Sequence, residues 1–151
     1  MLDPADCVKD LLATAGVGTF NTVTGWCLSI GQWPDSPDTC ILINQTGGRP
    51  PYPQLLINFP SVHCVVRGSK SGYQAARTKA GDIVDALLGM NSTLVGQSVS
   101  PAYAGDMYRA CNQIGDIAYL GQDENTRPMF SLNFSFIVLP ADTGGHRVAI
   151  T

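Results

Sequence analysis

The side chains best suited to catalysis in this sequence are its two histidines, His63 and His146. His63 directly precedes Cys64 in an apolar stretch that is typical of a β-strand. Because neighbouring residues of a strand point to opposite faces, these two side chains cannot form a nucleophile–base dyad. His146 follows a Gly144-Gly145 pair, where a preorganised catalytic geometry is not expected. The sequence therefore predicts that the protein is not an enzyme.

Metal and cofactor sites are not indicated either. The five cysteines are odd in number, widely spaced and without a CxxC pair, which argues against a disulfide framework and a zinc site. Asp123 and Glu124 are adjacent carboxylates, but no further ligands flank them, and a charged hairpin loop is the simpler interpretation. The segment 16–18 (GVG) ends a helical pattern instead of leaving a strand, so it is not a dinucleotide fingerprint. We predict no cofactor, no metal and reduced thiols in a chain synthesised in a cytoplasm.

The composition indicates a globular chain whose surface is partly covered by other protein copies. Its 151 residues suffice for one domain, and only 14% of them are charged, against roughly 25% in average soluble domains. A net charge of −3 leaves no basic face for tight binding of nucleic acid. Four basic residues gather at Arg67, Lys70, Arg77 and Lys79, and a solvated or interface-lining cluster explains them better than a phosphate site. No apolar run reaches the roughly 18 residues that a membrane span needs.

Two helices and several strands are expected to position the functional side chains. Asp3 is a natural N-cap for a first amphipathic helix, which Gly16 ends. Ser71 begins a capping-box pattern for a second helix, which Gly89 ends. Strands are predicted from apolar runs and alternation at 22–30, 39–45, 61–67, 93–99, 107–113, 117–120 and 130–139.

The stretch 130–139 has the strongest strand pattern, because five apolar residues alternate with polar ones and fix one face toward a core. The order helix, strands, helix, strands favours an α+β fold. We expect a single domain at 1–140, with a mixed, mostly antiparallel β-sheet and two main helices packed on one face. The segment 141–151 is expected to be a mobile tail. The proline-rich segment 47–53 and the polar segment 121–127 are expected to be exposed loops.

Short motifs of turn residues and strand ends follow one another along the chain. They are GQWPDSPD at 31–38 after the first helix, the apolar strand 40–44, GGRP at 47–50, Pro60 before a strand that ends in VRG at 66–68, YQAA at 73–76, MYR at 107–109, LGQDE at 120–124, RP at 127–128 and NF at 133–134. In this order the series resembles the minor capsid and tail terminator proteins of tailed bacteriophages, and it covers most of the chain.

The resemblance implies a compact domain whose sheet is backed by helices. It implies a virion structural protein that assembles as a ring, typically of six copies, at the end of the tail tube. Such a ring stops tube polymerisation and joins the tail to the head in the neck of the virion. The implied partners are other copies of the chain, the tail tube protein and the head–tail connector or neck proteins. DNA only passes through the lumen, and the family has no catalytic residues to carry over.

Seven residues in and near the two expected loops are candidates for contacts with neighbouring copies or with the tube. They are Arg49, Pro51, Tyr52, Arg67, Asp123, Glu124 and Arg127. Ordinary solvent-exposed turns are the alternative explanation for both loops. Two further functions stay open: a head-completion or head–tail joining protein elsewhere in the neck, and a small cytoplasmic ligand-binding domain, which predicts a deep pocket lined by convergent polar groups.

Overall fold

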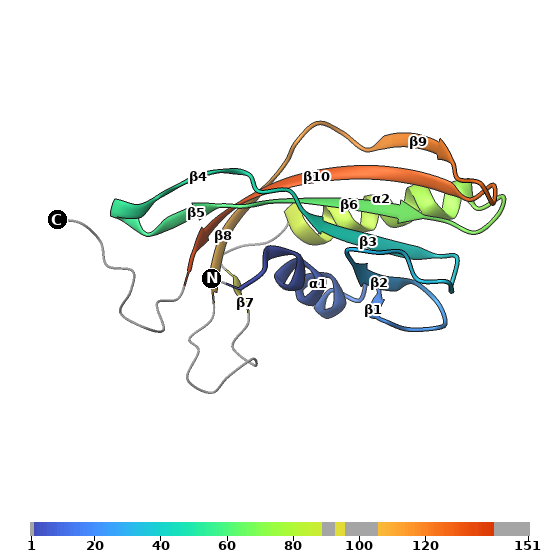
Figure 1. Cartoon of the computed structure of the whole chain (residues 1–151), viewed down its shortest axis with the longest axis horizontal. Helices are drawn as coiled ribbons and strands as arrows, with labels where there is room; N and C mark the ends of the chain where they lie inside the picture. Colours follow the sequence, from blue (N-terminus) through green and yellow to red (C-terminus); the bar gives the residue numbers. More distant parts are fainter. Residues whose placement is uncertain (1, 89–92, 96–105, 141–151) are drawn as a thin grey trace.

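The computed structural model describes residues 2–88, 93–95 and 106–140 of the chain. They form an α+β domain with two helices on one face of a mixed, mostly antiparallel sheet, as predicted (Figure 1). The predicted tail 141–151 and most of the predicted strand 93–99 lie outside the described residues. The elements are α1 (Pro4–Thr14), β1 (Thr19–Phe20), β2 (Cys27–Ile30), β3 (Cys40–Gln45), β4 (Arg49–Tyr52), the 3-10 turn η1 (Pro53–Leu55), β5 (Ile57–Phe59), β6 (Ser61–Arg67), α2 (Tyr73–Leu88), β7 (Thr93–Val95), β8 (Asp106–Gln113), β9 (Ala118–Gln122) and β10 (Pro128–Leu139).

Strand β10 is the centre of the sheet because it pairs antiparallel with four other strands. Phe130 has Val66 of β6 as its partner on one side and Tyr119 of β9 on the other. Farther along, Val138 lies between β5 and β8 in the same way. Beyond β6 the sheet continues through β3, β2 and β1. Only the pairs β1–β2 and β2–β3 of this path are parallel.

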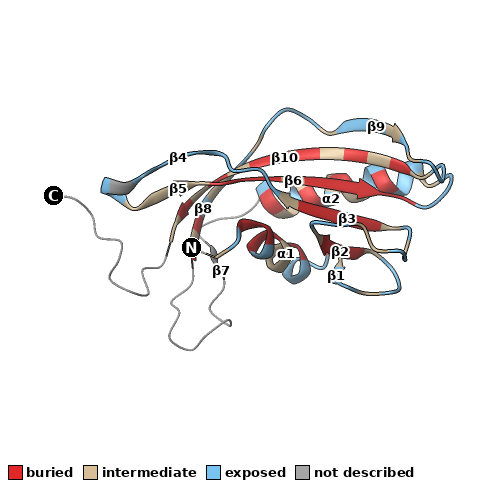
Figure 2. Cartoon of the chain, in the orientation of Figure 1, coloured by how far each residue is buried: buried red, intermediate tan, exposed pale blue. Residues whose placement is uncertain are grey.

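The side chains of β10 alternate between the two faces of the sheet. Its even-numbered residues from Phe130 to Val138 are buried, whereas the odd-numbered ones are half-buried on the opposite face (Figure 2). The buried set packs with Val8 and Leu12 of α1 and with Ile83 of α2 in one continuous core. The predicted core face of this strand is therefore confirmed, and both helices cover the same side of the sheet.

The ends of the helices follow local chemistry, although not always the predicted chemistry. Asp3 caps α1, since its carboxylate accepts a hydrogen bond from the N–H of Ala5 at 3.0 Å. Ser71 was the predicted cap of α2, and this prediction is wrong. The helix begins only at Tyr73, and Ser71 has a φ of 59°, which is not the extended conformation of an N-cap.

Two strand predictions are corrected by the structure. The segment 47–53, predicted as a loop, contains β4, whose first and last residues pair with β5 while the register skips the two prolines between them. Proline is tolerated there because β4 pairs only with β5 among the described residues and so lies at an edge of the sheet. The strand predicted at 22–30 begins only at Cys27, and the separate strand β1 was not predicted.

Candidate assembly surfaces

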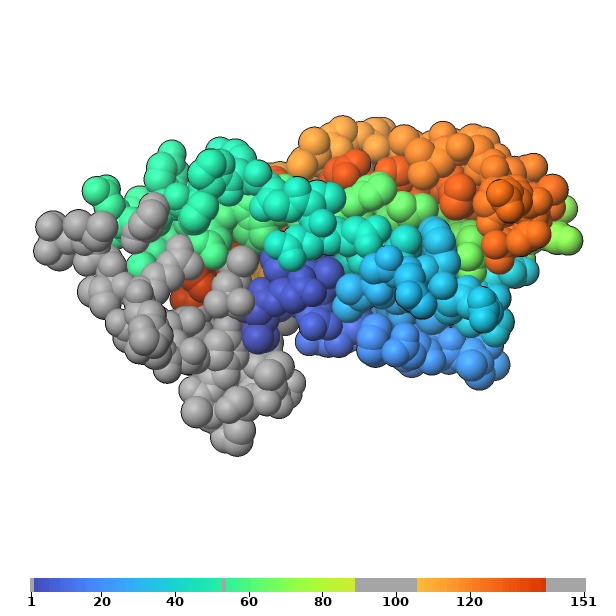
Figure 3. Space-filling view, viewed as in Figure 1, coloured from blue at the N-terminus to red at the C-terminus, as the bar shows by residue number. Residues whose placement is uncertain are grey.

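The seven candidate contact residues lie in two separate parts of the molecule. One part is the β4–η1–β5 hairpin, residues 49–59, which we call the arm. The other surrounds the β9–β10 turn and the adjoining end of β6. In the space-filling view these parts occupy opposite ends of the long axis (Figure 3). The arm holds Arg49, Pro51 and Tyr52, and the turn region holds Arg67, Asp123, Glu124 and Arg127.

The arm extends past the helices as a two-stranded ribbon (Figure 1). The ring of Phe59 joins its strands, because the guanidinium of Arg49 lies 4.4 Å from the ring centroid and the ring of Tyr52 meets it edge-on at 5.5 Å. Gly48 leads into the arm with a φ of 86°, and a Cβ at this position would overlap the carbonyl oxygen of Phe59. The backbone can therefore enter β4 this closely only with glycine.

The tip of the arm is apolar and open to contact. Tyr52 is 59% exposed and Leu55 is 64% exposed. A hollow of about 210 Å³ lies on the arm and is lined by Arg49, Pro50, Pro51, Tyr52 and Phe59. β5 joins the arm to β10, but β4 pairs only with β5 within the described residues, so these exposed apolar side chains at the tip are free to pack against a second surface.

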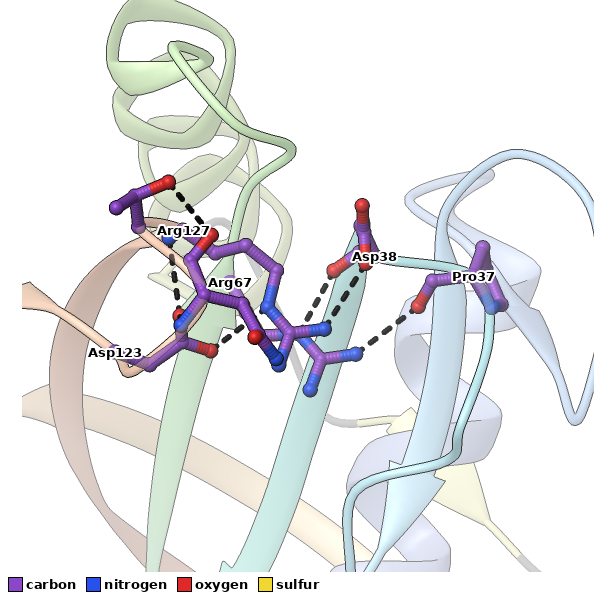
Figure 4. Close-up of polar contacts among 7 residues, drawn as sticks. Pro37, Asp38, Arg67, Asp123 and Arg127 are labelled. Atoms are coloured by element: carbon purple, nitrogen blue, oxygen red, sulfur yellow. Dashed lines mark hydrogen bonds and ion pairs between the residues drawn. The ribbon is translucent and has the colours of Figure 1, made fainter.

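Arg67, at the end of β6, is buried within its own subunit with 3% exposure. Its Nε donates to the carbonyl oxygen of Asp38 at 2.9 Å, and its Nη2 donates to that of Pro37 at 3.0 Å (Figure 4). Its guanidinium also stacks over the ring of Trp33, 4.5 Å from the centroid. Burial lowers the pKa of Arg67, and the positive charge of Arg127 lowers it further.

The β9–β10 turn closes around Asp123. Its Oδ1 accepts the backbone N–H groups of Asn125 and Arg127, each at 3.0 Å, and its Oδ2 accepts from the Nε of Arg127 at 2.7 Å. Burial raises the pKa of Asp123, but the hydrogen bonds from Arg127 and Asn125 outweigh it and hold the pKa below its ordinary value. The carboxylate therefore stays ionised and holds the turn closed.

Arg127 extends this network to a distant loop. Its Nη1 lies 2.9 Å from Oδ1 of Asp38. Burial lowers the pKa of Arg127, but the hydrogen bonds to Asp38 and Asp123 more than compensate, and the pKa is raised. Arg67, Arg127, Asp38 and Asp123 thus form one arrangement, which we call the arginine clamp, around the loop 31–39 between β2 and β3.

The structure divides the seven candidates into residues whose polar groups bond within the chain and residues that are exposed to solvent. Arg67, Asp123 and Arg127 come together, but their polar groups are engaged inside the chain. Glu124, in the same turn, is exposed, as are the candidates of the arm. Asp38 was not among the candidate residues, because its carboxylate meets Arg127 only after folding. Its one sequence signal was its place in the proline- and aspartate-rich motif at 31–38.

Another hollow, of about 380 Å³, lies between the end of α1 and the side of α2. Its lining includes Lys79, Asp82 and Asp85. The Nζ of Lys79 donates to the carbonyl oxygen of Val17 at 3.1 Å and lies 3.7 Å from Asp82. The amino group of Lys79 therefore already has partners among the residues that line the hollow. Within residues 2–88, 93–95 and 106–140 no three His, Cys, Asp or Glu side chains form a group that could hold a metal.

Exposed apolar side chains that lie together, such as Tyr52 and Leu55 of the arm, are typical of surfaces that contact another protein. No helix in the described part of the chain is long and apolar enough to cross a membrane. Residues 11–140 match the family described as bacteriophage tail terminator protein. Because the match spans most of the chain, the protein belongs to this family of virion structural proteins. No curated protein matches the chain.

Proposed function

We propose that this protein caps the tail tube as a ring of six copies, ends tail polymerisation and joins the tail to the head. The family match over residues 11–140 carries the proposal. The partners in this role are neighbouring copies, the tail tube protein and a head–tail connector or neck protein. The site of action is the head-proximal end of the tail.

The charge of the chain supports a ring through which DNA passes without being held. A net charge of −3 repels phosphates instead of attracting them. The low charged fraction of 14% suits faces that are covered by other proteins.

The arm and Glu124 are the contact surfaces that we assign to this role. Tyr52 is an aromatic side chain with more than half of its surface exposed, and Pro51 stiffens the backbone beside it. Interfaces are enriched in aromatic residues and arginine, which fits Tyr52 together with Arg49. Glu124 contributes a carboxylate at the opposite end of the molecule, where it can meet a basic group of the tube or of a neighbour.

Tube growth in the presence of the purified protein tests the capping role. Tail tube protein is polymerised with and without the chain, and tube lengths are measured by electron microscopy. Capped tubes should stop growing, and native mass spectrometry of the released caps should give six copies. Tubes that keep growing and bind none of the protein would contradict the proposal. Binding to the connector but not to the tube would instead assign the protein to head completion.

A single substitution tests the arm. Tyr52→Ala should weaken tube capping by about tenfold or more, since exposed aromatic anchors dominate many interfaces. It should leave the melting temperature nearly unchanged, because the side chain lies largely outside the core. Leu88→Ala is the matched control, since Leu88 is 41% exposed but lies on α2. Equal capping by both variants would remove the arm from the contact surface.

A further inference from the structure

Four strands of the described sheet pair on one side only: β1, β4, β7 and β9. Within the described residues, β9 pairs only with β10, and β1 pairs only with β2. These strands lie at opposite borders of the sheet (Figure 1). Each therefore presents a row of backbone N–H and C=O groups with no partner strand, which is a template for pairing with another chain.

The β9 edge has only part of the usual protection against such pairing. It is short, and its register with β10 shifts beside Leu120, both of which hinder strand addition. Its sequence AYLGQ contains no charge and no proline, whereas lysine and proline are common on natural free edges. The cartoon coloured by burial shows β9 largely exposed (Figure 2). An edge of this composition is expected to be covered in the working protein.

Exposed apolar side chains gather at the β1 edge and at the β9 edge. Tyr119 of β9 stacks edge-on with Tyr73 at 5.1 Å, which extends the apolar surface of β9 onto the start of α2. Phe20 of β1 lies under the Nζ of Lys9 at 4.6 Å from its centroid. Six of the nine large exposed hydrophobic side chains in the described residues lie at these ends: Phe20 and Val23 at the β1 end, and Tyr73, Ile114, Tyr119 and Leu120 at the β9 end.

The strand directions fit a head-to-tail contact. β1 and β3 run the same way, β6 runs against β3, β10 against β6, and β9 against β10. β9 therefore runs opposite to β1. If a second copy continues the sheet with its helices on the same side, its β1 meets β9 antiparallel.

We propose that the β9 edge of one copy pairs with the β1 edge of the next copy. The inference rests on the proposed ring and names the surfaces that build it. The contact is heterologous, because a different border of each copy takes part, and a heterologous contact closes into a ring when its rotation allows. β1 is only two residues long, so the ladder contributes few hydrogen bonds, and the apolar side chains at both borders supply the remaining contact.

Thiol cross-linking tests the contact in the full chain. A variant with both Phe20→Cys and Leu120→Cys is treated with a short bismaleimide in the presence of tail tubes. The expected result is a ladder of covalent oligomers that reaches the ring size. Mixing the two single variants should give dimers only. The unsubstituted chain, whose five thiols are buried or half-buried, sets the background.

The outcomes separate the contact from the capping role. Capped tubes without a ladder would overturn the β9–β1 contact while leaving the proposed function intact. Covalent dimers from Leu120→Cys alone would overturn it too, because they would show β9 pairing with β9. Failure of the proposed function appears instead as uncapped tubes. In that case a ladder from the concentrated protein alone still supports the contact, and its absence overturns it.

A charged substitution on the β9 edge tests the contact independently, through its effect on ring formation. Leu120→Lys should weaken ring formation by about tenfold or more, because a lysine on an edge strand opposes strand addition. Leu120 is 52% exposed, so the fold should persist. Leu88→Lys, at 41% exposure on α2, is the matched control and should form rings normally. Equal ring formation by the two variants would overturn the proposal.

Discussion

Arg127 donates a hydrogen bond of 2.9 Å to the carboxylate of Asp38, although 89 positions separate them in the chain. This bond ties the β9–β10 turn to the loop 31–39, which Arg67 holds through two backbone carbonyl groups. The loop joins two parallel strands, a connection that an α-helix usually makes. In this protein a loop makes the connection, and the hydrogen bonds of the arginine clamp hold that loop against the sheet.

Removing Arg67 tests the clamp. Arg67→Leu keeps much of the buried volume but leaves the carbonyl groups of Pro37 and Asp38 without their donor. The free energy of unfolding should fall by about 1–3 kcal/mol, and limited proteolysis should cut within 31–39 more readily. Arg77→Leu, at an exposed position on α2, should change neither quantity by a comparable amount. An unaltered cleavage pattern in Arg67→Leu would show that the loop is held by other contacts.

The adjacent carboxylates of the β9–β10 turn should behave differently. Asp123→Ala removes the acceptor of three hydrogen bonds and should lower the free energy of unfolding by about 1–2 kcal/mol. Glu124→Lys should change it by less than about 0.5 kcal/mol, as surface substitutions usually do, while weakening tube capping. Chemical denaturation and capping assays on both variants measure the contrast. Reduced stability in Glu124→Lys, with normal capping, would remove Glu124 from the contact surface.

The core face of β10 permits a quantitative test. Phe134 has no exposed surface, so Phe134→Ala leaves a cavity and should cost about 3–5 kcal/mol of stability. Leu55→Ala at the tip of the arm is the control and should be nearly neutral, because Leu55 is mostly exposed. Denaturant titration compares the two. A Phe134→Ala variant as stable as the parent protein would contradict the assigned core.

The regular parts of the fold were predictable because local patterns and tertiary packing agree there. The alternation along 130–139 fixed the face of β10, and the apolar run at 39–45 identified β3, whose first four residues are buried. The failures have a physical cause as well. Prolines in β4 suggested a loop, because the sequence does not reveal that β4 is an edge strand in which they need no ladder bond.

The sequence predicted which segments form the candidate surfaces, but not which role each residue in them has. The sequence located the arm and the β9–β10 turn. It could not separate Glu124, which is exposed, from Asp123, which closes its own turn. Nor could it show that Arg67 is buried, since its partners Pro37 and Asp38 lie 30 and 29 positions away. The role of Arg67 depends on long-range contacts, for which one sequence carries no periodic signal. The partners of Asp123 are local, two and four positions away, but the sequence alone does not show which of the two adjacent carboxylates they bind.

His63 makes stability depend on pH in a defined window. Its Nε2 lies 2.7 Å from the hydroxyl of Ser131 on the half-buried face of the sheet, and burial lowers its pKa below the ordinary value. The folded protein thus binds the proton less tightly than the unfolded chain, so this contribution to stability is present above the ordinary pKa of about 6.5 and is lost as pH falls below it. Carboxylates with a lowered pKa, such as that of Asp123, change the stability of the protein only at more acidic pH.

The His63→Gln variant isolates this effect. Between about pH 7.5 and 5.5, the melting temperature of the parent protein should fall more than that of His63→Gln, because glutamine does not titrate. Differential scanning calorimetry at several pH values measures the difference. Ser131→Ala is the control, since it removes the hydrogen bond to His63 but keeps the titrating ring. A parent protein and a glutamine variant with parallel pH profiles would show that the His63 pKa is the same in the folded and unfolded chains.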